Sequence, residues 1–209
     1  IGDRSLSKRD FSRITTPLKK FGAKFYYKTK NKLPLSILGT KSLEGINYLE
    51  NKGSAQCKSS VMLAALNASG TTSIKAKKSR DHSELLFKYL KIPTKIKKTQ
   101  NYDFIDIKRP TKIKAFNYRI PADISSSAFF IVLTILADNS KLLIKNVNIN
   151  PSRTGVIKIL KKMGAKIFFK NIKSYKGEKI SDILVKSSNN LKAISCPSML
   201  NSSAIDEFL

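Results

Sequence analysis

The chain has 209 residues, of which 41% are hydrophobic and 9% aromatic, so it can bury a core in one large domain or two small ones. Its formal net charge is +26, with 40 basic residues spread along the whole sequence against 14 acidic ones. This composition excludes a disordered chain and leaves three explanations for the charge: nucleic-acid binding, small anionic substrates, or a compositional bias towards Lys, Asn and Ile.

Cysteine content and hydropathy exclude further classes of protein. Cys57 and Cys196 are too few for a disulfide framework and lack metal-ligand spacing, so we expect reduced thiols and no metal site. The longest apolar run, 128–137, is too short to cross a bilayer, and no signal peptide is recognisable. The sequence starts at Ile1 without Met and stops at Leu209 where a helical turn begins, so we expect a fragment.

An internal repeat organises the chain. Residues 18–28 match residues 160–170 closely, and each stretch predicts the end of an amphipathic helix, a glycine stop and a strand. Residues 85–98 repeat this pattern with a proline in place of the glycine. Residues 59–74 correspond to residues 126–144, each predicting a helix that is apolar on all sides, and therefore buried, followed by a strand.

The repeating unit is a βαβαββ module, so we predict an α/β (α+β) protein. The first strand of the module is expected at residues 46–49 in one copy and at 115–118 in the next. Hairpin turns are expected at residues 30–32, 100–101 and 175–177.

A proline at residue 121 interrupts the pattern just before a helix start, so a boundary is expected at residues 119–121. Earlier in the chain, residues 54–56 and 79–81 each lead into a helix, and the second carries an arginine. Backbone N–H groups at a helix start, with a cation beside them, form an anion site. Two ordinary capped helices explain the same residues, and on this stretch alone that interpretation is the favoured one.

Six motifs follow one another along essentially the whole chain: GDRSLSKR at 2–9, SAQCKS at 54–59, SRDH at 79–82, DISSSAFF at 123–130, NPSRTG at 150–155 and IDEF at 205–208. In this order they resemble the motifs of the enolpyruvyl transferase family, in the branch that acts on shikimate 3-phosphate. The resemblance implies a two-lobed inverse α/β barrel built of βαβαββ units, here truncated at both ends. Residues 1–120 would be most of the first lobe, and residues 121–209 the start of the second.

The resemblance also implies five substrate-binding residues, which are Arg9, Ser54, Ala55, Gln56 and Arg80. Arg9 would hold phosphoenolpyruvate, since a guanidinium donates two parallel hydrogen bonds to a carboxylate or phosphate. Ser54, Ala55 and Gln56 would contact shikimate 3-phosphate, and Arg80 would contact its phosphate group. Without the resemblance, the two arginines are surface cations among 40 basic residues and the serine is a helix N-cap.

Asp206 matches the family's catalytic aspartate, which serves proton transfer at the attacking 5-hydroxyl. The alternative role is that of a first-turn acid at a helix start. The chain departs from the family at Asp10, Ala122 and Leu209, where proline, glycine and proline are usual. The family's N-terminal Lys-Ser pair and its C-terminal Glu, Lys and Arg are missing, so we expect these 209 residues alone to be inactive.

The implied reaction transfers the enolpyruvyl group of phosphoenolpyruvate to the 5-hydroxyl of shikimate 3-phosphate and releases phosphate. The resemblance implies a cytoplasmic monomer in the shikimate pathway of aromatic amino acid biosynthesis, with no metal or organic cofactor and no nucleic-acid or membrane partner. Three alternatives stay open: an enolpyruvyl transferase that uses a UDP-sugar in cell-wall synthesis, a basic nucleic-acid-binding module motivated by the charge, and a degraded or truncated relative with no enzymatic role.

Overall fold

The computed structural model describes residues 2–197, 200–204 and 207. Its contacts divide the chain into two compact units, each with its own core. Unit 1 comprises Ile1–Ser79 and Phe87–Lys114, and unit 2 comprises Arg80–Leu86 and Ala115–Leu209. The assignment of residues 1–120 and 121–209 to two lobes stays a prediction.

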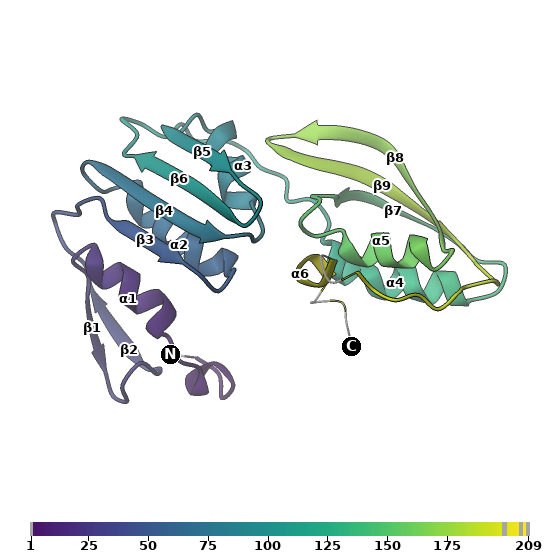
Figure 1. Ribbon diagram of the computed structural model, residues 1–209, viewed down its shortest axis with the longest axis horizontal. Coiled ribbons are helices and arrows are strands. Elements are labelled where there is room, and N and C mark those ends of the chain that lie inside the picture. Colours follow the sequence, from purple (N-terminus) through teal and green to yellow (C-terminus); the bar gives the residue numbers. More distant parts are fainter. Residues whose placement is uncertain (1, 198–199, 205–206, 208–209) are drawn as a thin grey trace. The chain divides into compact units, whose positions relative to one another are not determined.

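Unit 1 contains one complete βαβαββ module preceded by a helix and a hairpin (Figure 1). The preceding elements are η1 (Leu6–Lys8), α1 (Ser12–Lys20), β1 (Lys24–Tyr27) and β2 (Leu35–Leu38). The module consists of β3 (Asn47–Glu50), α2 (Ala55–Ala65), β4 (Thr71–Lys77), α3 (His82–Tyr89), β5 (Thr94–Lys98) and β6 (Tyr102–Lys108), and the first residues of α3 belong to unit 2. Its sheet has the order β3-β4-β6-β5, in which β3 and β4 are parallel and the other pairs antiparallel.

The core of unit 1 follows from strand alternation. In β4, Ile74 and Ala76 are buried while the lysines between and beside them are exposed, as expected for a sheet with one covered face. Val61 and Met62 of α2 are fully buried in the same core. The basic residues of this strand therefore occupy solvent positions and leave the core apolar.

Unit 2 is a three-stranded antiparallel sheet with helices against one face (Figure 1). Its elements are α4 (Ile124–Leu136), β7 (Lys141–Asn148), α5 (Gly155–Lys162), β8 (Lys166–Tyr175), β9 (Glu178–Lys186) and α6 (Asn201–Ala204), with sheet order β7-β9-β8. Ile131 and Ile135 of α4 pack with Ile157 of α5 and with Ile183 and Val185 of β9. No helix of the described residues is long and apolar enough to cross a membrane.

The internal repeat predicted from the sequence is confirmed. Gly22 and Gly164 occupy the same place after α1 and α5, with φ of 98° and 100°, a conformation that side chains with a Cβ rarely adopt. In the third copy, the left-handed residue after α3 is Lys91, with φ of 55°. The predicted hairpin turns also form, and two of them place Asn31 and Lys176 at positive φ.

Two expectations were wrong. Residues 115–118 form no strand; Ala122 instead makes the isolated bridge to Val147 of β7 that stands in the place of a first strand. Neither apolar helix is buried on all sides: Leu63 of α2 is more than half exposed, and on α4 the large side chains that remain more than half exposed are Phe129, Phe130, Leu133 and Leu136. The opposite side of α4 packs on the sheet, and none of the described elements covers its four exposed side chains.

Candidate functional site

The predicted substrate residues Ser54, Ala55 and Gln56 form the first turn of α2. Ser54 is the N-cap, and its Oγ accepts a hydrogen bond of 3.3 Å from the N–H of Cys57. Ser54 and Ala55 are half-buried and Gln56 is exposed, whereas Cys57 is buried in the core-facing side of the helix. Local chemistry thus places the three predicted residues together at an accessible helix start.

The turn before this helix is held by a buried carboxylate. Glu50, at the end of β3, is only 3% exposed, and its two oxygens accept backbone N–H groups of Lys52 and Gly53 at 3.1 and 2.8 Å. Gly53 has φ of 71°, so a glycine suits this position. Two hydrogen bonds from one carboxylate therefore fix the backbone that leads into Ser54.

Arg9 lies in the same unit but on a different element. It follows the short helix η1 and its side chain is exposed. The neighbouring Asp10, which departs from the family pattern, accepts a hydrogen bond of 2.6 Å from the N–H of Ser12 at the start of α1. Hydrogen bonds from Ser12 lower the pKa of this carboxyl, so Asp10 stays charged beside the predicted anion-binding arginine.

Arg80 lies in the irregular segment between β4 and α3, and the residues next to it are held by contacts within unit 2. Asp81 Oδ1 accepts a hydrogen bond of 2.9 Å from the side-chain amide of Asn150. His82 Nδ1 lies 2.5 Å from Oε1 of Glu178, at the start of β9. Residues 79–82, which the sequence predicted as a helix start, are therefore also attached by side chains to two distant segments.

Arg80 lines a hollow of about 460 Å³ in unit 2, together with Tyr118, Asp123, Arg153 and Glu178. Burial raises the pKa of the Tyr118 hydroxyl, and the nearby Glu178 carboxylate raises it further. The hollow thus combines two guanidinium groups with carboxylates and a hydroxyl. Such a set can bind an anion and orient a hydroxyl-bearing molecule beside it.

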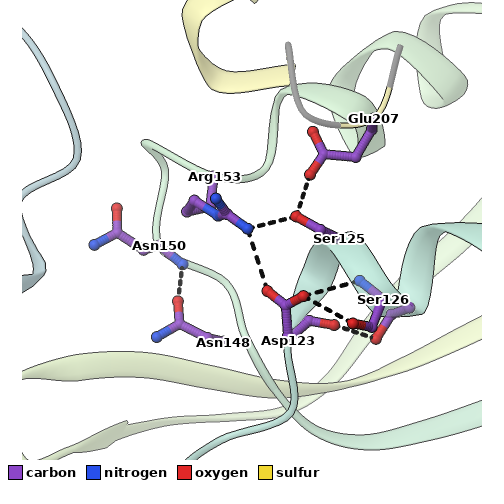
Figure 2. A network of polar contacts seen from close by, with 8 residues as sticks. Asp123, Ser125, Ser126, Asn148, Asn150, Arg153 and Glu207 are labelled. Carbon is purple, nitrogen blue, oxygen red and sulfur yellow. Dashed lines mark hydrogen bonds and ion pairs between the residues drawn. The ribbon is translucent and has the colours of Figure 1, made fainter. Parts of the chain in front are cut away.

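A network beside this hollow joins three of the sequence motifs (Figure 2). Asp123 is the N-cap of α4 and accepts hydrogen bonds from the N–H and Oγ of Ser126 at 2.9 and 3.0 Å. Its other oxygen lies 3.2 Å from the Arg153 guanidinium, which also donates to Ser125 Oγ, and this hydroxyl donates to Glu207. The motifs at 123–130, 150–155 and 205–208 therefore meet in space.

The electrostatics of this network favour a charged Asp123. Partial burial of the carboxyl works to raise its pKa, but hydrogen bonds from Ser126 and Ser125 and the charge of Arg153 outweigh it, so the pKa is lowered. The same carboxylate therefore caps the first turn of α4 through the N–H of Ser126. The predicted catalytic residue Asp206, one position before Glu207, lies outside the described residues, and its role stays a prediction.

Sequence reasoning missed Asn150, Glu178 and the contact of Ser125 with Arg153. Asn150 belongs to a recognised motif, but nothing local marks its side chain as the partner of Asp81, which is 69 residues away. Glu178 is a single acid after a hairpin turn in a lysine-rich chain. Within residues 2–197, 200–204 and 207, no group of three or more His, Cys, Asp or Glu side chains is placed to hold a metal ion.

The comparisons with known proteins all indicate the same family. The model of EPSP synthase (3-phosphoshikimate 1-carboxyvinyltransferase) matches residues 1–202. The chain is 43% identical to the 3-phosphoshikimate 1-carboxyvinyltransferase of Hydrogenovibrio crunogenus, over 100% of this chain and 47% of that protein. The corresponding protein of Petrotoga mobilis is 41% identical, over 99% of this chain and 47% of that protein. The chain thus spans about half the length of the curated relatives it matches.

Solved structures agree with the sequence comparison. The EPSP synthase of Acinetobacter baumannii superposes with a TM-score of 0.84 at 40% identity, covering 99% of this chain and 47% of that one. The enolpyruvyl transferase NikO of Streptomyces tendae gives a TM-score of 0.62 at 13% identity, covering 88% and 43%, and shows likeness of fold alone. The predicted fold class, a mixed α/β protein of repeated units of the enolpyruvyl transferase type, is therefore confirmed.

Proposed function

The chain belongs to the EPSP synthase family, and from this membership we propose that the protein containing it transfers the enolpyruvyl group of phosphoenolpyruvate to the 5-hydroxyl of shikimate 3-phosphate. The observation that carries the proposal is the identity of 40–43% with EPSP synthases over essentially the whole chain. The reaction releases phosphate. We further propose a cytoplasmic monomer that needs no metal or organic cofactor.

The five predicted binding residues divide between the two anionic substrates. Arg9 would hold phosphoenolpyruvate, and Ser54, Ala55 and Gln56 would contact shikimate 3-phosphate at the first turn of α2. Arg80 would bind the phosphate of shikimate 3-phosphate, a role for which its guanidinium is chemically suited. Its place on a hollow with a second arginine supports this assignment.

The proposed chemistry is an addition followed by an elimination. The 5-hydroxyl adds to the central carbon of phosphoenolpyruvate, while a proton goes to its methylene carbon and the hydroxyl proton is removed. The tetrahedral intermediate then loses phosphate and a methyl proton, which restores the carbon–carbon double bond and gives the enol ether product. Asp206 would act at the hydroxyl proton, since a carboxylate beside an alcohol serves as general base.

The lobe assignment is part of the proposal. Residues 1–120 would form most of the first lobe of the full-length protein, and residues 121–209 the start of the second. By this proposal, the missing N- and C-terminal motifs complete the site, so the 209 residues alone would show no turnover.

The test is phosphate release from phosphoenolpyruvate plus shikimate 3-phosphate by the full-length protein that contains this chain. Loss of a general base lowers turnover about 10²–10⁴-fold, so we expect such a loss in Asp206→Ala. Asp138→Ala, which removes an exposed carboxylate after α4, serves as the matched control and should keep wild-type turnover. No turnover by the wild type with shikimate 3-phosphate, together with turnover of a UDP-sugar, would overturn the proposal in favour of the cell-wall reaction.

A further inference from the structure

The side chain of Asn150 joins three segments that are distant in sequence. Its amide nitrogen donates to Asp81 Oδ1 at 2.9 Å and to Glu178 Oε2 at 3.3 Å. Its amide oxygen accepts from the N–H and Oγ of Ser152 at 2.8 and 2.7 Å. Because an amide has two N–H groups and two lone pairs, the hydrogen-bonding capacity of this side chain is fully used.

Burial makes these hydrogen bonds consequential. Asn150 is 3% exposed and Glu178 is 6% exposed, so neither polar group can exchange its partner for water. The backbone N–H of Asn150 is also held, by Asn148 Oδ1 at 2.8 Å (Figure 2). Asn150 is therefore a fixed point on unit 2 against which another segment can be oriented.

The segment it holds is the one that carries Arg80. Residues 79–81 belong to neither β4 nor α3, so no strand ladder or helix fixes the direction of the arginine. The two residues that follow Arg80 in sequence are attached by their side chains: Asp81 to Asn150, and His82 to Glu178. Glu178 uses one oxygen for each of His82 and Asn150, which links the two attachments into one unit.

We propose that Asp81, His82, Asn150 and Glu178 form a clamp that positions Arg80 for the phosphate of the substrate. The proposal rests on the function proposed above only in naming that substrate. The four residues are positioning residues that act through Arg80, because the hydrogen bonds described here join Asp81 and His82 to Asn150 and Glu178.

The clamp also accounts for a charge arrangement that would otherwise be unfavourable. The carboxylates of Asp81 and Glu178 both approach the amide nitrogen of Asn150, and like charges at such separation repel. The amide donates one N–H to each, and His82 lies on the far oxygen of Glu178. Replacing the amide removes both hydrogen bonds and leaves the two acids facing each other, so residues 80–82 should shift away from Glu178.

The first experiment is a double-mutant cycle on the full-length protein, with Asn150→Ala, Arg80→Ala and the combination of both. Losing the hydrogen bonds of a positioning side chain should raise the KM for shikimate 3-phosphate about tenfold, while the KM for phosphoenolpyruvate stays within about twofold. In the Arg80→Ala background the same change should have no further effect, because the clamp acts through the arginine. Asn101→Ala, in the exposed turn between β5 and β6, is the control and should leave both KM values unchanged.

Additive effects of the two substitutions, or an equal rise of both KM values, would overturn the proposal and assign Asn150 a purely structural role. If Asn150→Ala does not fold, His82→Ala decides, because the His82 side chain is 40% exposed and its loss leaves the core intact. An unchanged KM for shikimate 3-phosphate in His82→Ala would then overturn the clamp.

Amide hydrogen exchange separates the clamp from the proposed function. Exchange at residues 80–84 should be faster in Asn150→Ala than in the wild type, whatever the substrate. In the variant, local opening of this segment no longer has to break the hydrogen bonds of the clamp. Equal exchange in the two proteins would overturn the anchoring itself. If the wild type binds no shikimate 3-phosphate, the proposed function and the substrate named here are overturned. Faster exchange in Asn150→Ala than in that wild type would still establish the anchoring.

Discussion

Removal of the Asp123 carboxylate should destabilise unit 2, because this group both caps α4 and pairs with Arg153. Asp123→Ala loses the N-cap of α4, which contributes about 1 kcal/mol. It also loses the ion pair with Arg153; because the Asp123 side chain is 51% exposed, this pair contributes about 0.5 kcal/mol after solvent screening. The expected sum is about 1.5 kcal/mol, which lowers the melting temperature of a chain of this size by about 3–6 °C.

Asp123→Asn separates the two contributions, since asparagine is as good an N-cap as aspartate but carries no charge. Only the ion-pair part, about 0.5 kcal/mol, should be lost in this variant at pH 7. Because the folded-state pKa of Asp123 lies below its usual value of 3.8, the charge stabilises the protein above that pH, and this stabilisation disappears as the pH falls through the folded-state pKa. The gap between wild type and Asp123→Asn should therefore close below about pH 3.8.

Urea unfolding followed by circular dichroism between pH 2.5 and 7 measures both effects, with Asp138→Ala and Asp138→Asn as controls for the change of charge. The controls should lie within about 0.5 kcal/mol of wild type, as expected for an exposed residue. A loss in Asp123→Ala no larger than in Asp138→Ala, or a gap for Asp123→Asn that persists unchanged to pH 2.5, would refute this account of the network.

Two further predictions concern packing, and each has a matched control. Gly45→Ala would place a Cβ 2.2 Å from the backbone oxygen of Thr71, so we expect a loss of about 1–3 kcal/mol in urea unfolding, whereas Gly39→Ala meets nothing within 4 Å and should be neutral. Ile131→Ala, at 0% exposure in the core of unit 2, should lower the free energy of unfolding by about 2–5 kcal/mol. Its control Ile120→Ala, at 83% exposure, should lower it by less than about 0.5 kcal/mol. Equal losses within either pair of variants would contradict the packing described.

Features of this fold that depend on neighbouring residues could be predicted from the sequence. The glycine stops at Gly22 and Gly164 follow from the end of an amphipathic helix, and both adopt the left-handed conformation that such a stop requires. The capping of α4 by Asp123 likewise follows from residue type and position. The left-handed Lys91 could not be predicted, because the proline at position 93 already explained the end of the helix.

Features that depend on distant partners were not predictable. The exposed residues of α4 carry the same apolar side chains as its buried ones, so composition alone could not tell which side the sheet covers. At the candidate site, the motifs located Arg80 and Ser54 by resemblance, but the groups that hold these segments are Asn150 and Glu50, whose partners are set by the fold. Sequence identified the residues proposed to touch the substrates, and the structure adds the residues that orient them.

Glu50 and Asn150 thus play corresponding parts at the two proposed binding segments. Each is a buried polar residue whose side chain holds an irregular turn that leads into a helix. Glu50→Gln keeps the shape of the side chain but turns an amide N–H towards the N–H of Lys52 or Gly53, leaving one buried donor unpaired at a cost of about 1–3 kcal/mol.

Because the turn held by Glu50 leads directly into Ser54–Gln56, Glu50→Gln should raise the KM for shikimate 3-phosphate several-fold in addition to lowering stability. Glu44→Gln makes the same chemical change at an exposed carboxylate six residues before Glu50, and it should change neither quantity. Steady-state kinetics of the full-length variants at a temperature well below unfolding distinguish the two effects. A Glu50→Gln protein that is destabilised but binds shikimate 3-phosphate normally would show that the turn is held by Glu50 for folding alone, and that its rigidity does not reach the binding residues.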